Sequence, residues 1–166
     1  MIHQGPGFPS VERAWVYAAT RELTDEEIAE IRRQMDDFLR SWEDHGVPLR
    51  ASGDVLHRRF VVLFAKNPNG RVDGCAIDKS VLWMKNLGAQ LKVDFFDRMK
   101  LFYFKDNRVH MVEKDALNTL YQRGEIDDNT LFFNTVVQTR EEFDRQWLLP
   151  FKDHWARRFI SVGQAI

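Results

Sequence analysis

The chain has 166 residues, a length typical of one domain built around one hydrophobic core. Its 44% hydrophobic and 13% aromatic residues exclude an intrinsically disordered protein. The formal net charge is −1 and the charges are interspersed, which argues against a nucleic-acid binder. No apolar run approaches the roughly 20 residues of a membrane span. We therefore expect a single domain, residues 1–166, without a membrane segment.

The first third of the chain predicts an arm, a strand and a helix. Glycine and proline interrupt residues 1–12 too closely for regular structure, so an irregular N-terminal arm is expected. The bulky segment 14–19 favours a short strand. A helix is predicted over 24–45, because Thr24 and Glu27 form a capping-box pattern and the apolar residues that follow recur every three or four positions.

The middle of the chain predicts a buried strand followed by a second helix. A strand is predicted over residues 59–66, because its run 60–64 is apolar on both faces, which is typical of a central, covered strand. Residues 67–70 break that strand. A helix is then expected to begin near Asp78 or Ser80, either of which can act as its N-cap. Gly88 is unfavourable in its last turn by about 1 kcal/mol relative to alanine.

The second half predicts a hairpin, a helix and a further strand. Residues 99–104 and 108–112 flank a short polar connection, which indicates a β-hairpin. Residues 114–123 carry apolar side chains on one side and precede a glycine, so a third helix is predicted. Residues 130–137 have strong β character.

A fourth helix is expected from Thr139, which forms another capping-box pattern with Glu142, and Pro150 should end it. A C-terminal tail over 150–166 follows. The order of elements predicts an α+β fold: a mixed, mainly antiparallel sheet of about five strands with three to four helices packed on it.

Three segments carry a resemblance to a known family: residues 41–46, 74–80 and 133–137. Together they resemble a small family of uncharacterised bacterial proteins of about this length, some of which carry the label "ABC transporter ATPase". The resemblance implies no particular chemistry. An ATPase of that class needs a glycine-rich loop ending in Gly-Lys-Ser/Thr, and the sequence has none, so nucleotide hydrolysis is not expected.

Cys75 is the first candidate for chemistry. It is the only cysteine, so no internal disulfide can form, and we expect the reducing cytoplasm as its compartment. It lies in a glycine-containing loop that leads into a helix, where the positive end of the helix dipole favours a thiolate. The competing interpretation is a buried thiol that acts as a small apolar side chain. Candidate partners are a histidine base and an orienting carboxylate: His45, His57 or His154, with Asp73 or Asp78.

Two similar segments suggest an anion pocket. His57 and Arg59 lie beside one aromatic run, and His154, Arg157 and Arg158 lie beside another. Guanidinium groups bind phosphate or carboxylate in a bidentate manner, and aromatic faces can stack on a base. The alternative is that these are solvated charges and ion pairs.

No metal site or cofactor is predicted, because the five histidines lack ligand spacing and the cysteine has no partner. Trp147, Phe151 and Trp155 are interpreted as anchors of the tail or as a contact between two copies of the chain. The leading hypothesis is a cytoplasmic binding or regulatory domain for a small anionic ligand or a protein partner, including a homodimer. The alternative is a cysteine-dependent enzyme that uses Cys75, His45 and Asp78.

Overall fold

The computed structural model describes residues 11–161, so the arm predicted over residues 1–12 lies almost wholly outside the described residues. The described chain contains four α-helices, three short 3-10 helices and nine strands whose pairings are all antiparallel. The predicted α+β class is thus confirmed. No helix within residues 11–161 has the length and apolar character required to cross a membrane.

The chain forms two compact units, whereas the sequence predicts one core. Unit 1 comprises residues 11–96 and 136–143, and unit 2 comprises residues 97–135 and 144–161. Each unit has its own hydrophobic cluster. The strands are accordingly distributed over sheets of three, two and four strands rather than one sheet of about five.

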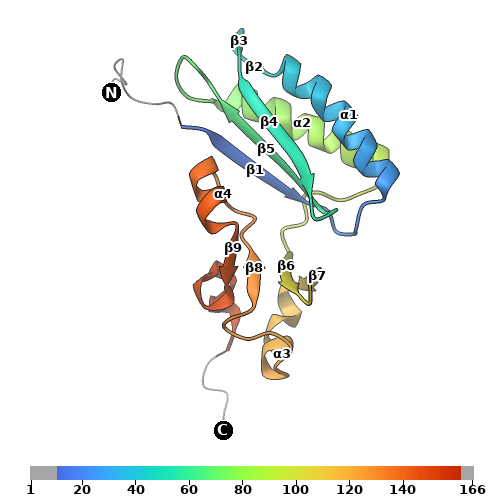
Figure 1. Ribbon diagram of the computed structural model, residues 1–166, viewed down its shortest axis with the longest axis vertical. Coiled ribbons are helices and arrows are strands. Elements are labelled where there is room, and N and C mark those ends of the chain that lie inside the picture. Colours follow the sequence, from blue (N-terminus) through green and yellow to red (C-terminus); the bar gives the residue numbers. More distant parts are fainter. Residues whose placement is uncertain (1–10, 162–166) are drawn as a thin grey trace. The chain divides into compact units, whose positions relative to one another are not determined.

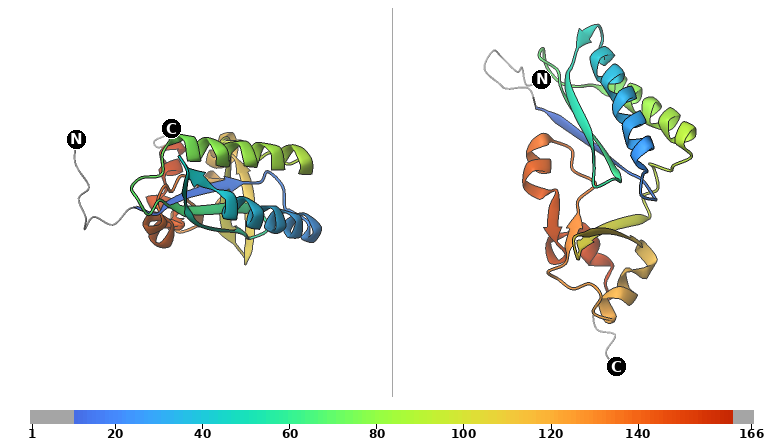
Figure 2. Two further views of the ribbon diagram at one scale, coloured as in Figure 1. Left: turned by 90° about the horizontal axis from the view of Figure 1, so that it is seen from above. Right: turned by 45° about the vertical axis from the view of Figure 1, so that its right-hand side comes forward.

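Unit 1 is a three-stranded sheet with two helices on one face, as Figure 1 and the right-hand view of Figure 2 show. Its elements, in chain order, are β1 (Arg13–Ala18), α1 (Asp25–Ser41), β2 (Glu43–Asp44), β3 (Val47–Pro48), β4 (Arg50–Leu56), β5 (Phe60–Lys66) and α2 (Gly74–Leu91). The sheet order is β1-β5-β4, and β2 and β3 form a separate small hairpin.

The central strand of this sheet is β5, as its sequence predicts. Val61, Leu63 and Ala65 are buried in the cluster that contains the inner faces of α1 and α2. Phe64 lies on the opposite face and packs against the ring of Phe143 at 5.1 Å. Burial on both faces explains why this segment has no alternating polar residues.

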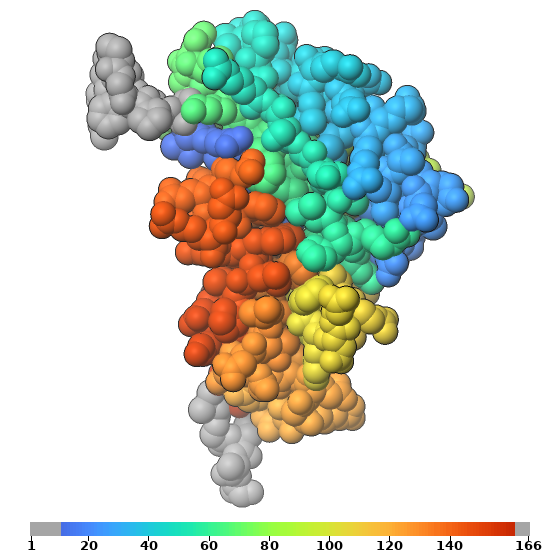
Figure 3. All heavy atoms as spheres, viewed as in Figure 1, coloured from blue at the N-terminus to red at the C-terminus, as the bar shows by residue number. Residues whose placement is uncertain are grey.

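Helix α1 begins at the predicted capping box. The Thr24 hydroxyl accepts a hydrogen bond from the Glu27 N–H at 3.1 Å, and the Glu27 carboxylate accepts one from the Thr24 N–H at 2.9 Å. A hydrogen bond from Arg21 and the one from the Thr24 N–H lower the pKa of Glu27 to about 2. The blue surface in Figure 3 belongs largely to α1, whose charged stripe is exposed.

Helix α1 ends at Ser41, four residues before the predicted end at His45. The chain turns out of the helix at Trp42, whose backbone is extended. The indole of Trp42 is buried, and its N–H donates to the carbonyl of Ala76 in α2 at 2.9 Å. This anchor brings the residues that follow α1 close to the start of α2.

Helix α2 begins at Gly74, earlier than the sequence predicts. Its N-cap is Asp73, so the prediction that Asp78 or Ser80 caps the helix is wrong. The Asp73 carboxylate accepts a hydrogen bond from the Cys75 N–H at 3.2 Å, which satisfies one of the free donors of the first turn. The Ser80 hydroxyl instead donates to the Ile77 carbonyl inside the helix.

Unit 1 is completed by a segment from much later in the chain. The Ala14 N–H of β1 donates to the Gln138 carbonyl at 3.0 Å, and Arg13 forms a β-bridge with Thr139. Thr139 caps α4 (Arg140–Gln146) through a hydrogen bond from the Glu142 N–H. The outer edge of β1 is therefore partly covered by residues that the sequence separates from it by more than a hundred positions.

Unit 2 is a four-stranded sheet in the order β7-β6-β8-β9, with short helices between and after its strands. Its elements are β6 (Lys100–Lys105), β7 (Arg108–Glu113), η1 (Lys114–Ala116), α3 (Leu117–Gln122), β8 (Leu131–Phe133), β9 (Leu148–Pro150), η2 (Phe151–Asp153) and η3 (Trp155–Phe159). The predicted hairpin is confirmed, with Asp106 and Asn107 in left-handed conformation at its turn.

The C-terminal segment folds into the core of unit 2. Phe151 is fully buried and stacks on Phe132 with ring centroids 4.5 Å apart. Trp155 contacts Phe159, and Ile160 is buried in the same cluster. The burial and ring contacts of these side chains support the interpretation that they anchor the C-terminal segment.

Candidate functional site

A tight hairpin after α1 creates the most unusual polar site in unit 1. Strands β2 and β3 are joined by only two residues, His45 and Gly46, which have φ angles of 49° and 83°. Two positive φ angles are typical of the type I′ turn, whose twist matches that of the paired strands. The turn places Asp44 and His45 next to each other, facing the first turn of α2.

Three potential ligand groups meet there. The His45 Nε2 atom lies 2.9 Å from Asp73 Oδ2 and 3.8 Å from Asp44 Oδ1. One ligand atom from each residue lies within 4.8 Å of the other two. The Asp44 side chain is only 2% exposed, whereas those of His45 and Asp73 are 69% and 49% exposed. The cluster thus has a buried floor and an open side.

Each carboxylate uses one oxygen to support the fold and presents the other to the cluster. Asp44 Oδ2 accepts a hydrogen bond from the backbone N–H of Asp73 at 2.9 Å and a longer one from the Asn67 amide at 3.5 Å. Asp73 Oδ1 accepts the capping bond from the Cys75 N–H. The two remaining oxygens are the ones near the His45 ring. These hydrogen bonds therefore hold both carboxylates in place, as supporting hydrogen bonds do around a metal site.

The remaining oxygen of Asp44 is the least expected feature of the site. Asp44 Oδ1 is buried, yet no donor in residues 11–161 forms a hydrogen bond with it. A buried carboxylate oxygen without a partner is costly, and a second carboxylate beside it adds repulsion. A cation among the three groups would compensate both charges.

The sequence-predicted catalytic residues are partly brought together. His45 contacts Asp73, one of the two proposed orienting carboxylates, and Asp73 also accepts the bond from the backbone of Cys75. Cys75 is exposed rather than buried, in the first turn of α2. Asp78 lies one turn further along the helix and is not part of the cluster. Asp44 was not anticipated, because nothing in the sequence distinguishes it from the exposed acidic residues nearby.

The residues of the predicted anion pocket belong to different units and have local roles in each. His57 and Arg59 lie at the β4–β5 turn of unit 1, where Arg59 is half-buried and donates to the Ala19 carbonyl at 3.3 Å. In unit 2, Arg157 forms an ion pair with Asp128 at 2.7 Å.

The other two residues of that pocket also lie in unit 2. His154 is buried, whereas Arg158 is exposed and lies over the ring of Phe159, 5.0 Å from its centroid. Arg157, Arg158 and His154 thus contact their own unit, and a shared pocket with His57 and Arg59 stays a prediction.

Comparison with known proteins assigns no function to this cluster. No family model, curated protein or solved structure matches the chain. The resemblance to an uncharacterised bacterial family stays a prediction.

Proposed function

We propose that the protein binds a divalent transition-metal ion through Asp44, His45 and Asp73. The observation that carries the proposal is the buried Asp44 oxygen, which lacks a hydrogen-bond donor and lies beside a second carboxylate and an imidazole. Around a metal with bonds of about 2.1 Å, neighbouring ligand atoms lie about 3–3.5 Å apart. The separations of 2.9 and 3.8 Å need only small side-chain adjustments to reach this range.

The donor set favours a particular class of ion. Calcium and magnesium prefer oxygen ligands alone, whereas one imidazole with two carboxylates suits zinc, manganese or iron(II). Three protein ligands leave coordination positions on the exposed side of the cluster, where His45 and Asp73 face solvent. Such an open site can hold water or a small anion as a further ligand. The protein would then bind a small anionic ligand, as the sequence leads us to expect, and the metal ion would coordinate that ligand.

Titration calorimetry with zinc chloride on chelator-treated protein tests this proposal. One zinc ion per chain is expected, and Asp44→Asn, His45→Asn and Asp73→Asn should each weaken its affinity by about tenfold or more. These replacements are chosen to preserve the fold. Asparagine tolerates the left-handed backbone of His45 and is as good an N-cap as Asp73.

Two variants provide matched controls. His57→Asn removes another histidine with a left-handed backbone, φ 51°, from a hairpin turn outside the cluster, and should leave zinc affinity unchanged. Cys75→Ser should also bind zinc normally. Loss of binding in Cys75→Ser would make the thiol a ligand and contradict the proposed ligand set. Unchanged binding in all three cluster variants would mean that zinc binds elsewhere on the chain.

A second candidate function is cysteine-dependent catalysis. It is favoured by one specific observation, because Asp73 contacts both the His45 ring and the backbone of Cys75. We propose the cytoplasm as the compartment, since the single thiol is exposed and would stay reduced there. Alkylation of Cys75 should then be fast at neutral pH, and His45→Asn should slow it strongly. Equal alkylation rates of Cys75 in the wild type and in His45→Asn would remove this candidate.

A further inference from the structure

A second candidate site of unit 1 lies at the C-terminal end of α2. It is separate in sequence from the cluster of Asp44, His45 and Asp73, and its lining is mainly apolar. It is a pocket of about 360 Å³ between the last turns of α2 and the segment 92–96. The inner lining is apolar, with Met84 and Phe95 buried and Phe96 37% exposed. Its volume lies within the range of small-molecule sites, roughly 300–1,000 Å³.

The pocket exists because the chain crosses α2 very closely. A Cβ atom at Gly88 would lie 2.7 Å from the carbonyl oxygen of Val93, so only glycine allows this approach. Lys92 ends the helix in left-handed conformation, and the Val93 N–H donates to the Gly88 carbonyl. Gly88 thus has a packing role, although the sequence alone presents it as an unfavourable residue for a helix.

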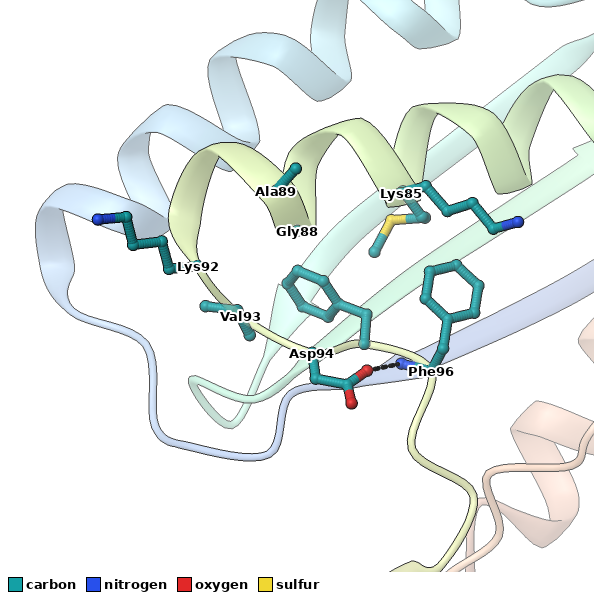
Figure 4. A pocket seen from close by; sticks show the side chains of 9 residues that line it. Lys85, Gly88, Ala89, Lys92, Val93, Asp94 and Phe96 are labelled. Atoms are coloured by element: carbon teal, nitrogen blue, oxygen red, sulfur yellow. Dashed lines mark hydrogen bonds between the residues drawn. The ribbon is translucent and has the colours of Figure 1, made fainter.

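The charges around the pocket are not balanced. Lys85 and Lys92 lie at its opposite ends, as Figure 4 shows, and neither forms an ion pair or a side-chain hydrogen bond with a described residue. The single carboxylate of the lining, Asp94, accepts a hydrogen bond from the Phe96 N–H at 2.8 Å and points away from α2. An apolar surface with two free cations at its rim suits an apolar molecule that carries one negative charge.

We infer that this pocket binds a small amphipathic carboxylate, with its apolar body against Phe96, Phe95 and Met84 and its carboxylate at Lys85. Figure 4 places the ring of Phe96 beneath the Lys85 side chain, so one ligand can contact both. The Tyr17 ring packs edge-on against Phe96, at 5.6 Å between centroids, and supports that wall of the pocket. The site is independent of the metal cluster, and the two proposals can fail separately.

Titration of the full chain with sodium decanoate below its micelle concentration, followed by amide NMR, tests the inference. Saturable shifts are expected at Gly88, Ala89 and Val93, and uncharged decanol should bind about threefold more weakly or worse. Lys85→Gln should weaken decanoate binding by about threefold. Lys79→Gln changes a lysine on the same helix outside the pocket and should have no effect.

A second variant tests the position of the apolar body. Ala89 is exposed at the pocket, so Ala89→Leu should narrow the opening without disturbing the core and should weaken decanoate binding. Its melting temperature should equal that of the wild type. Absence of saturable binding, equal affinity for decanol and decanoate, or full affinity in both Lys85→Gln and Ala89→Leu would overturn the inference.

Discussion

Replacing Trp42 by alanine is expected to lower the free energy of unfolding by about 3–5 kcal/mol, the usual effect of deleting a buried aromatic side chain. The Trp42 ring is 2% exposed and packs against Trp15 and Phe38, with centroids 5.3 and 5.0 Å away. Its N–H also holds the end of α1 to the Ala76 carbonyl of α2. Urea denaturation followed by circular dichroism measures the loss.

A second replacement separates packing from hydrogen bonding. Trp42→Phe keeps most of the aromatic contact but leaves the buried Ala76 carbonyl without its indole donor, so a loss of about 1–3 kcal/mol is expected. If Trp42→Phe were as stable as the wild type, the hydrogen bond would have no net effect on stability. The link between the two helices would then depend on ring packing alone.

Replacing His154 by alanine should have the next largest effect, about 3 kcal/mol, because it removes a buried ring and two hydrogen bonds at once. The ring nitrogen Nε2 lies 3.0 Å from the Phe133 carbonyl, and Nδ1 accepts a bond from the Ala156 N–H at 3.1 Å. This pairing requires a neutral imidazole that donates from Nε2. Urea denaturation at pH 7.5 measures the difference.

The same residue should make the protein sensitive to mild acid. Burial lowers the pKa of His154 below its ordinary value of 6.5, so the unfolded chain takes up a proton at a higher pH than the folded chain. The contribution of His154 is therefore complete above pH 6.5 and is lost as the pH falls through the lower, folded-state pKa. Stability measured from pH 7.5 to 5 should fall less steeply in His154→Ala. Equal slopes would contradict a buried, neutral His154.

The sequence predicts those elements whose determinants are local. The capping box of Thr24 and Glu27, the doubly buried strand β5 and the polar turn at Asp106 and Asn107 are all confirmed. Strand β4 was missed, because its exposed polar residues and Gly53 lack β character and only pairing with β5 makes it a strand. Long-range pairing is a tertiary effect that no local pattern encodes.

The division into two units was also not predicted. Residues 96–99 join the first part of unit 1 to unit 2, yet they contain neither glycine nor proline and resemble an ordinary loop before a strand. The observed strand β8 is shorter than the strand predicted over 130–137 for a similar reason. Its last residues belong to the segment 136–143, which leaves unit 2 and joins unit 1.

The candidate site was predictable only in part. His45 and Asp73 are recognisable as a base and an orienting carboxylate from their residue types and their positions next to predicted helix ends. Asp44 is not, because its burial depends on the two-residue turn at His45 and Gly46 and on the anchor at Trp42. A metal site made of residues from a hairpin and a helix N-cap has no fixed spacing in the sequence.

The late segment that covers β1 also constrains how the protein is made. A ribosome releases the chain from its N-terminus at about 5–20 residues per second, and early parts of a protein usually begin to fold first. Here β1 cannot gain its bonds to Gln138 and Thr139 until the first segment of unit 2, residues 97–135, has been synthesised. For roughly 6–24 s at that rate, a nascent chain would expose one edge of a strand, which is a template for pairing with other chains.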